Sequence, residues 1–308
     1  MKQLRIIFMG TPDFACSILE SLIKSEYEVV GVVSQPDKKV GRKQIIQKTP
    51  VKQLAEKYHL PVFQPLKIKE DYKDILALNP DLIVTCAYGQ MIPEHILNTP
   101  VYGSLNVHAS LLPKLRGGAP IHKAIITGEK KTGVSIMRMV KKMDAGDYML
   151  QKEIPIDELD TTGTLHDKLM KVGAEAIMEA IPLLISGKAV FVKQDETKAT
   201  FAYNISKEEE KIDLDKSYKD VYNHIRGLIP WPVGYIDFYG KKLKLHAVRL
   251  STITSSQAIG KVFVMDKKLC LACHGGVLEL LEVQLEGKKK CSDKEFINGN
   301  KNKLTGGD

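Results

Sequence analysis

The sequence lacks the long apolar segments that would place a chain across a membrane. In its 308 residues no apolar run approaches the roughly 20 residues that span a bilayer. The first residues, M-K-Q-L-R-I-I-F-M-G, have too short an apolar centre for a secretory signal and lack the Arg- and Ser-rich character of a transit peptide. The balance of 44% hydrophobic and 27% charged residues is typical of a globular protein. We therefore expect a cytoplasmic protein with no membrane partner.

Cysteine is scarce, and its use excludes a disulfide framework. Five cysteines without a secretory signal favour reduced thiols. Cys270-Leu-Ala-Cys273-His274 matches the C-x-x-C-H pattern of haem attachment, but the surrounding run is strand-like, which would direct the two thiols to opposite faces of a sheet. No second cysteine pair completes a zinc site. We expect neither haem nor a metal.

Two nucleotide-binding fingerprints are also missing. The first β-rich run ends in F-M-G-T-P-D-F, where Gly10 alone precedes a helical pattern, so the G-x-G-x-x-G fingerprint is absent. No G-x-x-x-x-G-K-[ST] occurs either. These absences argue against a nicotinamide cofactor and against a nucleoside triphosphate site of that type.

The first half of the chain alternates β-rich runs with helical patterns, which is typical of an α/β domain with a mainly parallel sheet. The predicted strands are residues 4–9, 28–34, 81–86, 103–107 and 133–139. The predicted helices are residues 14–24, 51–58, 71–78, 119–126 and 164–185, the last ended by Gly187. We expect a Rossmann-like domain over residues 1–188.

The pattern changes after a weakly periodic segment, residues 189–206, which we interpret as a linker. A predicted helix over residues 216–228 is followed by P-W-P and then by five short strands. These strands are residues 233–239, 242–250, 260–265, 269–273 and 277–284. Close-set strands of this kind predict a small OB-like β-barrel domain within residues 207–308.

Basic residues gather in two regions that contain no acid, and the net charge of +8 hints at a polyanionic partner. The first region has six cations: Lys38, Lys39, Arg42, Lys43, Lys48 and Lys52. The second lies between Phe238 and Met265, where Lys242, Lys244 and His246 alternate with apolar residues, so that one strand face would pack and the other be positive. The alternative is that both regions are merely solvated surface.

The most informative stretch is S-L-N-V-H-A-S-L-L-P-K-L-R-G, residues 104–117. In an extended segment Asn106 and His108 share one face, at the carboxyl end of a strand, where ligands bind in α/β sheets. Asp144 follows the last predicted strand of this half, and a carboxylate near His108 would orient the ring and favour the imidazolium. An amide donor, a histidine and an aspartate without a nucleophilic Ser or Cys suit direct acyl or formyl transfer through a tetrahedral intermediate.

This stretch resembles the folate-dependent formyltransferases, as do G-T-P-D-F, Q-P-D-K-K-V-G-R, A-Y-G-Q-M-I-P, D-A-G-D, Q-D-E-T and P-W-P elsewhere in the chain. The resemblance implies 10-formyltetrahydrofolate as the formyl donor and no metal. Its closest members act on the methionine of initiator tRNA in bacterial-type translation initiation, and we expect a monomer. Through this resemblance Asn106 would stabilise the oxyanion, His108 would act as acid and base at the departing folate nitrogen, and Asp144 would hold His108 and order a water.

The resemblance also assigns binding residues. The folate-contacting loop matches Ser110, Leu111, Leu112 and Pro113, with the Leu112–Pro113 peptide expected in the cis form. The tRNA-gripping loop matches Lys38, Lys39, Arg42 and Lys43. Two other readings remain open at this point. The chain is either a formyltransferase for a sugar nucleotide or another small acceptor, which would not need the basic G-R-K insert, or a non-catalytic RNA-binding protein.

Overall fold

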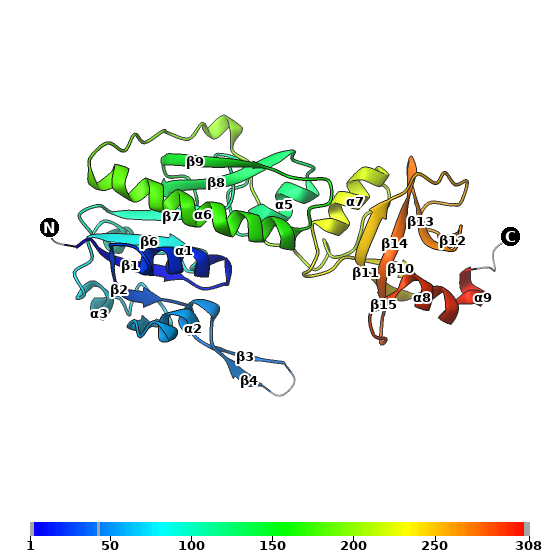
Figure 1. Cartoon of the computed structure of the whole chain (residues 1–308), viewed down its shortest axis with the longest axis horizontal. Coiled ribbons are helices and arrows are strands. Elements are labelled where there is room, and N and C mark those ends of the chain that lie inside the picture. Colours follow the sequence, from blue (N-terminus) through cyan, green and yellow to red (C-terminus); the bar gives the residue numbers. More distant parts are fainter. Residues whose placement is uncertain (1–2, 42–43, 305–308) are drawn as a thin grey trace. The chain divides into compact units, whose positions relative to one another are not determined.

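The chain forms two compact units in the computed structural model, which describes residues 3–41 and 44–304 (Figure 1). The first unit contains the residues up to Pro120 together with Thr132–Ile154 and His166–Tyr203. The second contains Ile121–Lys131, Pro155–Leu165 and the residues from Asn204 onward. Within the described ranges no helix combines the length and the apolar character that crossing a bilayer requires.

A seven-stranded sheet in the order β5-β2-β1-β6-β7-β8-β9 organises the first unit. Its strands are β1 (Arg5–Gly10), β2 (Glu28–Val33), β5 (Val62–Phe63), β6 (Leu82–Cys86), β7 (Ser104–His108), β8 (Lys131–Arg138) and β9 (Tyr148–Pro155). The strands from β5 to β7 pair in parallel, and β8 runs antiparallel to β7. The mainly parallel Rossmann-like sheet predicted from the alternating pattern is therefore confirmed.

Helices cover both faces of this sheet, which explains why its central strands are continuously apolar. The helices are α1 (Phe14–Ile23), α2 (Pro50–Lys57), α3 (Lys73–Leu76), α4 (Glu94–Leu97) and α6 (Thr162–Ile185), whereas α5 (Pro120–Ile126) belongs mainly to the second unit. On one face Gly173 of α6 lies against Val107 of β7 and Ile18 of α1. On the other, Ile7 and Met9 pack with residues of α3 and α4.

The predicted element boundaries hold to within one or two residues for most elements, and Gly187, with φ of +70°, follows α6 as expected. Helix α3 is shorter than the predicted 71–78, since the structure has only Lys73–Leu76. Strand β9 was not predicted because Y-M-L-Q-K-E-I-P is a half-buried edge strand without a clean apolar alternation. The hairpin formed by β3 (Lys38–Val40) and β4 (Ile45–Gln47) was also not predicted.

The second unit contains a curled antiparallel sheet in the order β10-β11-β14-β13-β12, with β15 paired to β14. Its elements are α7 (Tyr218–Arg226), β10 (Tyr235–Phe238), β11 (Lys241–Leu250), β12 (Val262–Met265), β13 (Lys268–Cys273), β14 (Gly276–Leu285), β15 (Cys291–Ser292), α8 (Asp293–Gly299) and α9 (Lys301–Leu304). In β11 Leu243 and Leu245 are fully buried and Lys242 is exposed, whereas Lys244, His246 and Ala247 are all half-buried and the pairing with β14 is irregular at Ala247. The predicted alternation therefore holds only over the first part of the strand. This half-barrel confirms the predicted OB-like second domain.

The C-x-x-C-H segment is a structural strand. Cys273 packs in the main core of the second unit, whereas Cys270 packs in a separate cluster with Phe263 and Val277, so the two thiols do face opposite sides. Burial raises the pKa of Cys273 to about 12, which makes its thiolate inaccessible at neutral pH. Over residues 3–41 and 44–304, no three His, Cys, Asp or Glu side chains gather in a way that could hold a metal ion.

Candidate active site

Asn106 and His108 lie at the carboxyl end of β7, two residues apart and therefore on one face of the strand. Asn106 is paired with Thr85 of β6 in the parallel register. The hydroxyl of Thr85 donates a hydrogen bond to Oδ1 of Asn106 over 2.8 Å. This contact fixes the amide with its nitrogen, the donor group, directed away from Thr85. A fixed N–H donor is the group that an oxyanion requires.

His108 is almost completely buried, and both of its ring nitrogens have neighbours. Its Nε2 lies 3.1 Å from the carbonyl oxygen of Leu115, a contact that requires a proton on Nε2. Its Nδ1 lies 3.8 Å from Oδ2 of Asp144. The second nitrogen therefore faces a carboxylate. This arrangement suits a histidine that transfers protons while an aspartate orients it and stabilises its cation.

Asp144 reaches His108 from a loop with an unusual backbone conformation. Its φ is +49°, in the left-handed region, and its Oδ2 accepts a hydrogen bond from the backbone N–H of Gly117 over 2.8 Å. Gly117 has φ of +122°, and a Cβ there would lie 2.7 Å from the carbonyl oxygen of Ala202. Only glycine therefore fits at the position that presents this N–H to the aspartate.

The loop after β7 is held by hydrogen bonds at most of its polar groups. The hydroxyl of Ser110 donates to a backbone carbonyl of the same loop, and that of Ser135 donates to the carbonyl oxygen of Ser110 over 2.7 Å. The amide of Gln151 donates to the carbonyl oxygen of Leu112 over 2.8 Å. The Leu112–Pro113 peptide is cis, as predicted. Ser110 is buried, so its side chain holds the loop in shape.

A buried polar network lies behind this loop and was not predicted. The side chain of Arg116 is fully buried and donates to Oε1 of Gln194 over 2.8 and 3.0 Å, and to the two carboxylate oxygens of Glu196 over 2.8 and 3.2 Å. The amide nitrogen of Gln194 donates to the carbonyl oxygens of Asp144, over 2.9 Å, and Gly146, over 2.7 Å. Sequence reasoning assigned residues 189–206 to a linker, and its only hint of this network was the Q-D-E-T match.

The carboxylate of Glu196 makes the stability of this network depend on pH. Hydrogen bonds from Arg116 and then Lys142 lower the pKa of Glu196 from 4.5 to about 2. A folded-state pKa below the unfolded one adds stability that is present above about pH 4.5 and is lost as the pH falls toward 2. We expect the difference in Tm between the wild type and Glu196→Gln to be largest near neutral pH and to narrow below about pH 4.5. Calorimetry across this range tests it, and a difference independent of pH would contradict the assignment.

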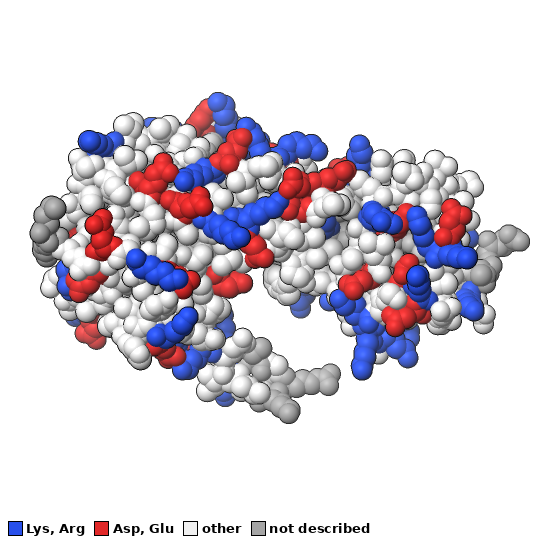
Figure 2. All heavy atoms as spheres, viewed as in Figure 1, with Lys and Arg blue, Asp and Glu red and all other residues white. Residues whose placement is uncertain are grey.

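The structure describes part of the predicted tRNA-gripping segment. Figure 1 shows β3 and β4 extending away from β2 and α2 as a two-stranded hairpin. Lys38 and Lys39 lie on β3 and are exposed, whereas Arg42 and Lys43 lie outside the described residues. Figure 2 shows acidic and basic side chains mixed over most of the face in view.

The basic surface of this segment is smaller than the sequence suggests. Lys52 donates to Asp37 and to Gln64, each over 2.7 Å, and Gln64 donates to the other oxygen of Asp37 over 2.7 Å. These three side chains, which we call the hairpin-base ring, close the base of the hairpin. Lys48 is paired with Glu56 over 2.7 Å. Two of the six cations are thus neutralised by acids from outside the acid-free segment.

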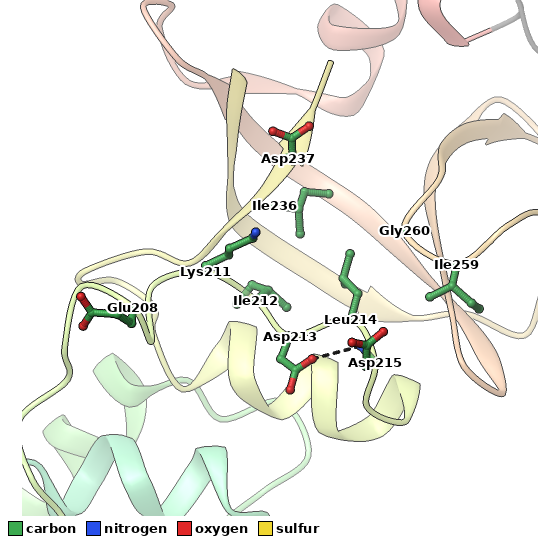
Figure 3. A pocket seen from close by; sticks show the side chains of 10 residues that line it. All are labelled: Glu208, Lys211, Ile212, Asp213, Leu214, Asp215, Ile236, Asp237, Ile259 and Gly260. Atoms are coloured by element: carbon green, nitrogen blue, oxygen red, sulfur yellow. Dashed lines mark hydrogen bonds between the residues drawn. The ribbon is translucent and has the colours of Figure 1, made fainter. Parts of the chain in front are cut away.

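A hollow of about 540 Å³ in the second unit has the wrong chemistry for the predicted ligands (Figure 3). Its ten lining residues include four acids and one lysine, Lys211. The acids are Glu208, Asp213, Asp215 and Asp237. Their negative charge would repel phosphates and carboxylates. None of the predicted site residues lines it.

Comparison with known proteins agrees with the fold. The family model described as formyl transferase matches residues 4–181, and the model of the formyl transferase C-terminal domain matches residues 204–301. The chain therefore belongs to the formyl transferase family, and it is an enzyme of the formyltransferase class. It is 49% identical over 303 residues to proteins named methionyl-tRNA formyltransferase from Bacillus thuringiensis and Bacillus anthracis, with 97% of this chain and 96% of each relative covered.

Solved structures show the same fold at low sequence identity. An N-formyltransferase from Helicobacter canadensis, crystallised with folinic acid and dTDP-3-aminofucose, matches with a TM-score of 0.69 and 18% identity over 90% of this chain and 99% of its own. HypX from Aquifex aeolicus, a structure of which contains tetrahydrofolic acid, matches with a TM-score of 0.68 and 16% identity over 96% of this chain. This chain spans about half the length of HypX, since 47% of that chain is covered.

Proposed function

We propose that this enzyme transfers the formyl group of 10-formyltetrahydrofolate to the amino group of methionyl-initiator tRNA, in the cytoplasm and as a monomer. The observation that carries the proposal is the 49% identity to proteins named methionyl-tRNA formyltransferase across nearly the full length of both chains. The solved neighbours of the same fold that were crystallised with tetrahydrofolate or its formyl derivatives support a folate donor.

The reaction needs no covalent enzyme intermediate. The neutral amino group attacks the formyl carbon, and the carbonyl oxygen becomes an oxyanion that the amide N–H of Asn106 stabilises. The proton released by the attacking nitrogen passes to His108 and on to the folate nitrogen as the bond between that nitrogen and the formyl carbon breaks. Asp144, 3.8 Å from the imidazole, stabilises its cation and orders the water that relays the proton.

The binding roles divide between the units. Residues 1–188 would hold the folate, with the loop Ser110–Pro113 against it, and residues 207–308 would bind tRNA. The exposed lysines of β3 and β11 would contact phosphates, which gives affinity that depends on salt and little on base sequence.

The acceptor is the open question, because sugar N-formyltransferases share this fold. The purified enzyme is incubated with 10-formyltetrahydrofolate and either methionyl-tRNA or dTDP-3-aminofucose, and the formylated product is measured. We expect rapid formylation of the tRNA and none of the sugar nucleotide. Formylation of the sugar alone would overturn the tRNA assignment. A failure to consume 10-formyltetrahydrofolate with either acceptor would also count against that assignment.

The basic hairpin gives a prediction about tRNA affinity. We expect Arg42→Ala to raise the KM for methionyl-tRNA by about 10-fold, the value of one charge-assisted contact, and to leave the KM for folate unchanged. Lys39→Ala should act in the same direction and reduce the salt dependence of tRNA binding. Lys24→Ala, an exposed lysine at the end of α1, is the matched control and should change neither constant. Equal effects on both substrates would mean that the hairpin does not select tRNA.

A further inference from the structure

We propose that Gln194 is a positioning residue for the formyl-transfer reaction, holding Asp144 in place through its backbone. The inference rests on the proposed role of Asp144. Asp144 belongs to a loop that is neither helix nor strand, and its φ of +49° lies in the left-handed region, which aspartate adopts more readily than most residues. The loop is therefore positioned by contacts with other segments. The N–H of Gly117 holds the carboxylate, and the side chain of Gln194 holds the backbone.

Both the nitrogen and the oxygen of the Gln194 amide form hydrogen bonds. Its nitrogen donates to the carbonyl oxygens of Asp144 and Gly146, which bracket the turn that carries the carboxylate. Its oxygen accepts twice from the guanidinium of Arg116. Only 4% of Gln194 is exposed, so these bonds form away from bulk water. The amide therefore ties the Asp144 loop to the segment after β7.

The same segment around Gln194 also supports the other side of His108. The N–H of Arg116 donates to the carbonyl oxygen of Thr200 over 2.9 Å, and the hydroxyl of Thr200 accepts from the N–H of Leu115 over 2.9 Å. Leu115 supplies the carbonyl oxygen that faces Nε2 of His108. Residues 194–200, which we call the strap, thus hold both neighbours of the imidazole ring, the Leu115 carbonyl and the Asp144 carboxylate.

Within the strap, one residue balances the charge of Arg116 and another holds the position of Asp144. Glu196 neutralises the buried guanidinium of Arg116 and is 53% exposed, and it reaches the Asp144 loop through an exposed ion pair with Lys142, a kind of contact that adds little stability. Gln194 is neutral and is the residue that contacts Asp144. Loss of the Glu196 charge should therefore lower stability, whereas loss of the Gln194 N–H groups should displace the aspartate. These two effects are separable by experiment.

The test is Gln194→Glu, which has the same shape as the wild-type residue. Its carboxylate still accepts from Arg116, so the protein should fold, with a Tm lowered by the loss of two buried hydrogen bonds. It has no N–H, however, and it places an oxygen against the carbonyls of Asp144 and Gly146. We expect kcat to fall by about 10- to 100-fold, the cost of a misplacement of about 1 Å, with the KM values for folate and acceptor within about two-fold of wild type.

Glu196→Gln is the matched control. It should also lower the Tm, but its kcat should stay within about two-fold of wild type. Gln194→Asn, whose shortened amide cannot reach both carbonyls, decides the matter if Gln194→Glu does not fold. A wild-type kcat in the foldable Gln194 variant overturns the proposal, as does an equal loss of kcat in Glu196→Gln. If the wild type formylates only a sugar nucleotide, the same variants are compared on that acceptor. The role of Gln194 is then tested even though the tRNA assignment has failed.

Discussion

Replacement of Asn106 by alanine is expected to lower kcat by about 100- to 1,000-fold, the usual cost of removing one oxyanion donor. The amide is held by Thr85 on one side, which leaves its nitrogen as a fixed donor on the other. Such a donor acts mainly on the transition state, because only there does the formyl oxygen carry a full negative charge. The KM for folate should therefore change little. Single-turnover formylation with saturating folate measures the effect directly.

Thr85→Val is the control for this prediction. It removes the hydroxyl that orients the amide but leaves Asn106 present and the volume nearly unchanged. We expect a loss of kcat that is smaller than that of Asn106→Ala, together with an intact fold by calorimetry. A rise in the KM for folate with kcat preserved in Asn106→Ala would show instead that the amide binds the ground state.

Replacement of His108 by alanine is expected to lower kcat by about 100- to 10,000-fold, the range of general acid-base catalysis. The ring is 6% exposed and is held between the carbonyl oxygen of Leu115 and the carboxylate of Asp144, so alanine removes the imidazole without admitting a replacement base from those two neighbours. Without it the departing folate nitrogen leaves as an anion or must draw its proton from water. The rate of product formation under single-turnover conditions measures this loss.

His95→Ala is the matched control, because His95 is an exposed histidine on α4 that packs edge-on against Tyr72. It should leave kcat unchanged. The kcat of Asp144→Asn should lie between those of His95→Ala and His108→Ala, because the imidazole stays in place while the negative charge beside it is lost. A His108→Ala enzyme that keeps its kcat and loses only affinity for folate would assign the histidine to binding.

The sequence predicts those features of the site that depend on residues close together in the chain. The placement of Asn106 and His108 on one face follows from the period of a strand, and the cis peptide before Pro113 was expected from the resemblance. The catalytic roles of these residues stay predictions until the variants are measured. The fold follows equally well, because buried parallel strands and amphipathic helices leave strong periodic signals.

What the sequence does not predict depends on residues that are distant along the chain. Arg116 and Gln194 are 78 positions apart, and no periodicity links an arginine to an amide that lies in a segment without regular structure. For the same reason, the sequence overstates the positive charge that residues 38–52 leave unpaired. Its lysines at positions 48 and 52 are neutralised by Glu56 and Asp37, which lie just beyond the segment's ends.

The hairpin-base ring has a consequence for how such enzymes diversify. Asp37, Lys52 and Gln64 complete hydrogen bonds with one another below β3 and β4, so the sheet beneath is held without any contribution from the hairpin's outer residues. We expect changes of charge beyond that ring to leave β7 and the Asp144 loop in place. Under the proposed function, the residues that contact tRNA and the residues that transfer the formyl group would then be mutable separately.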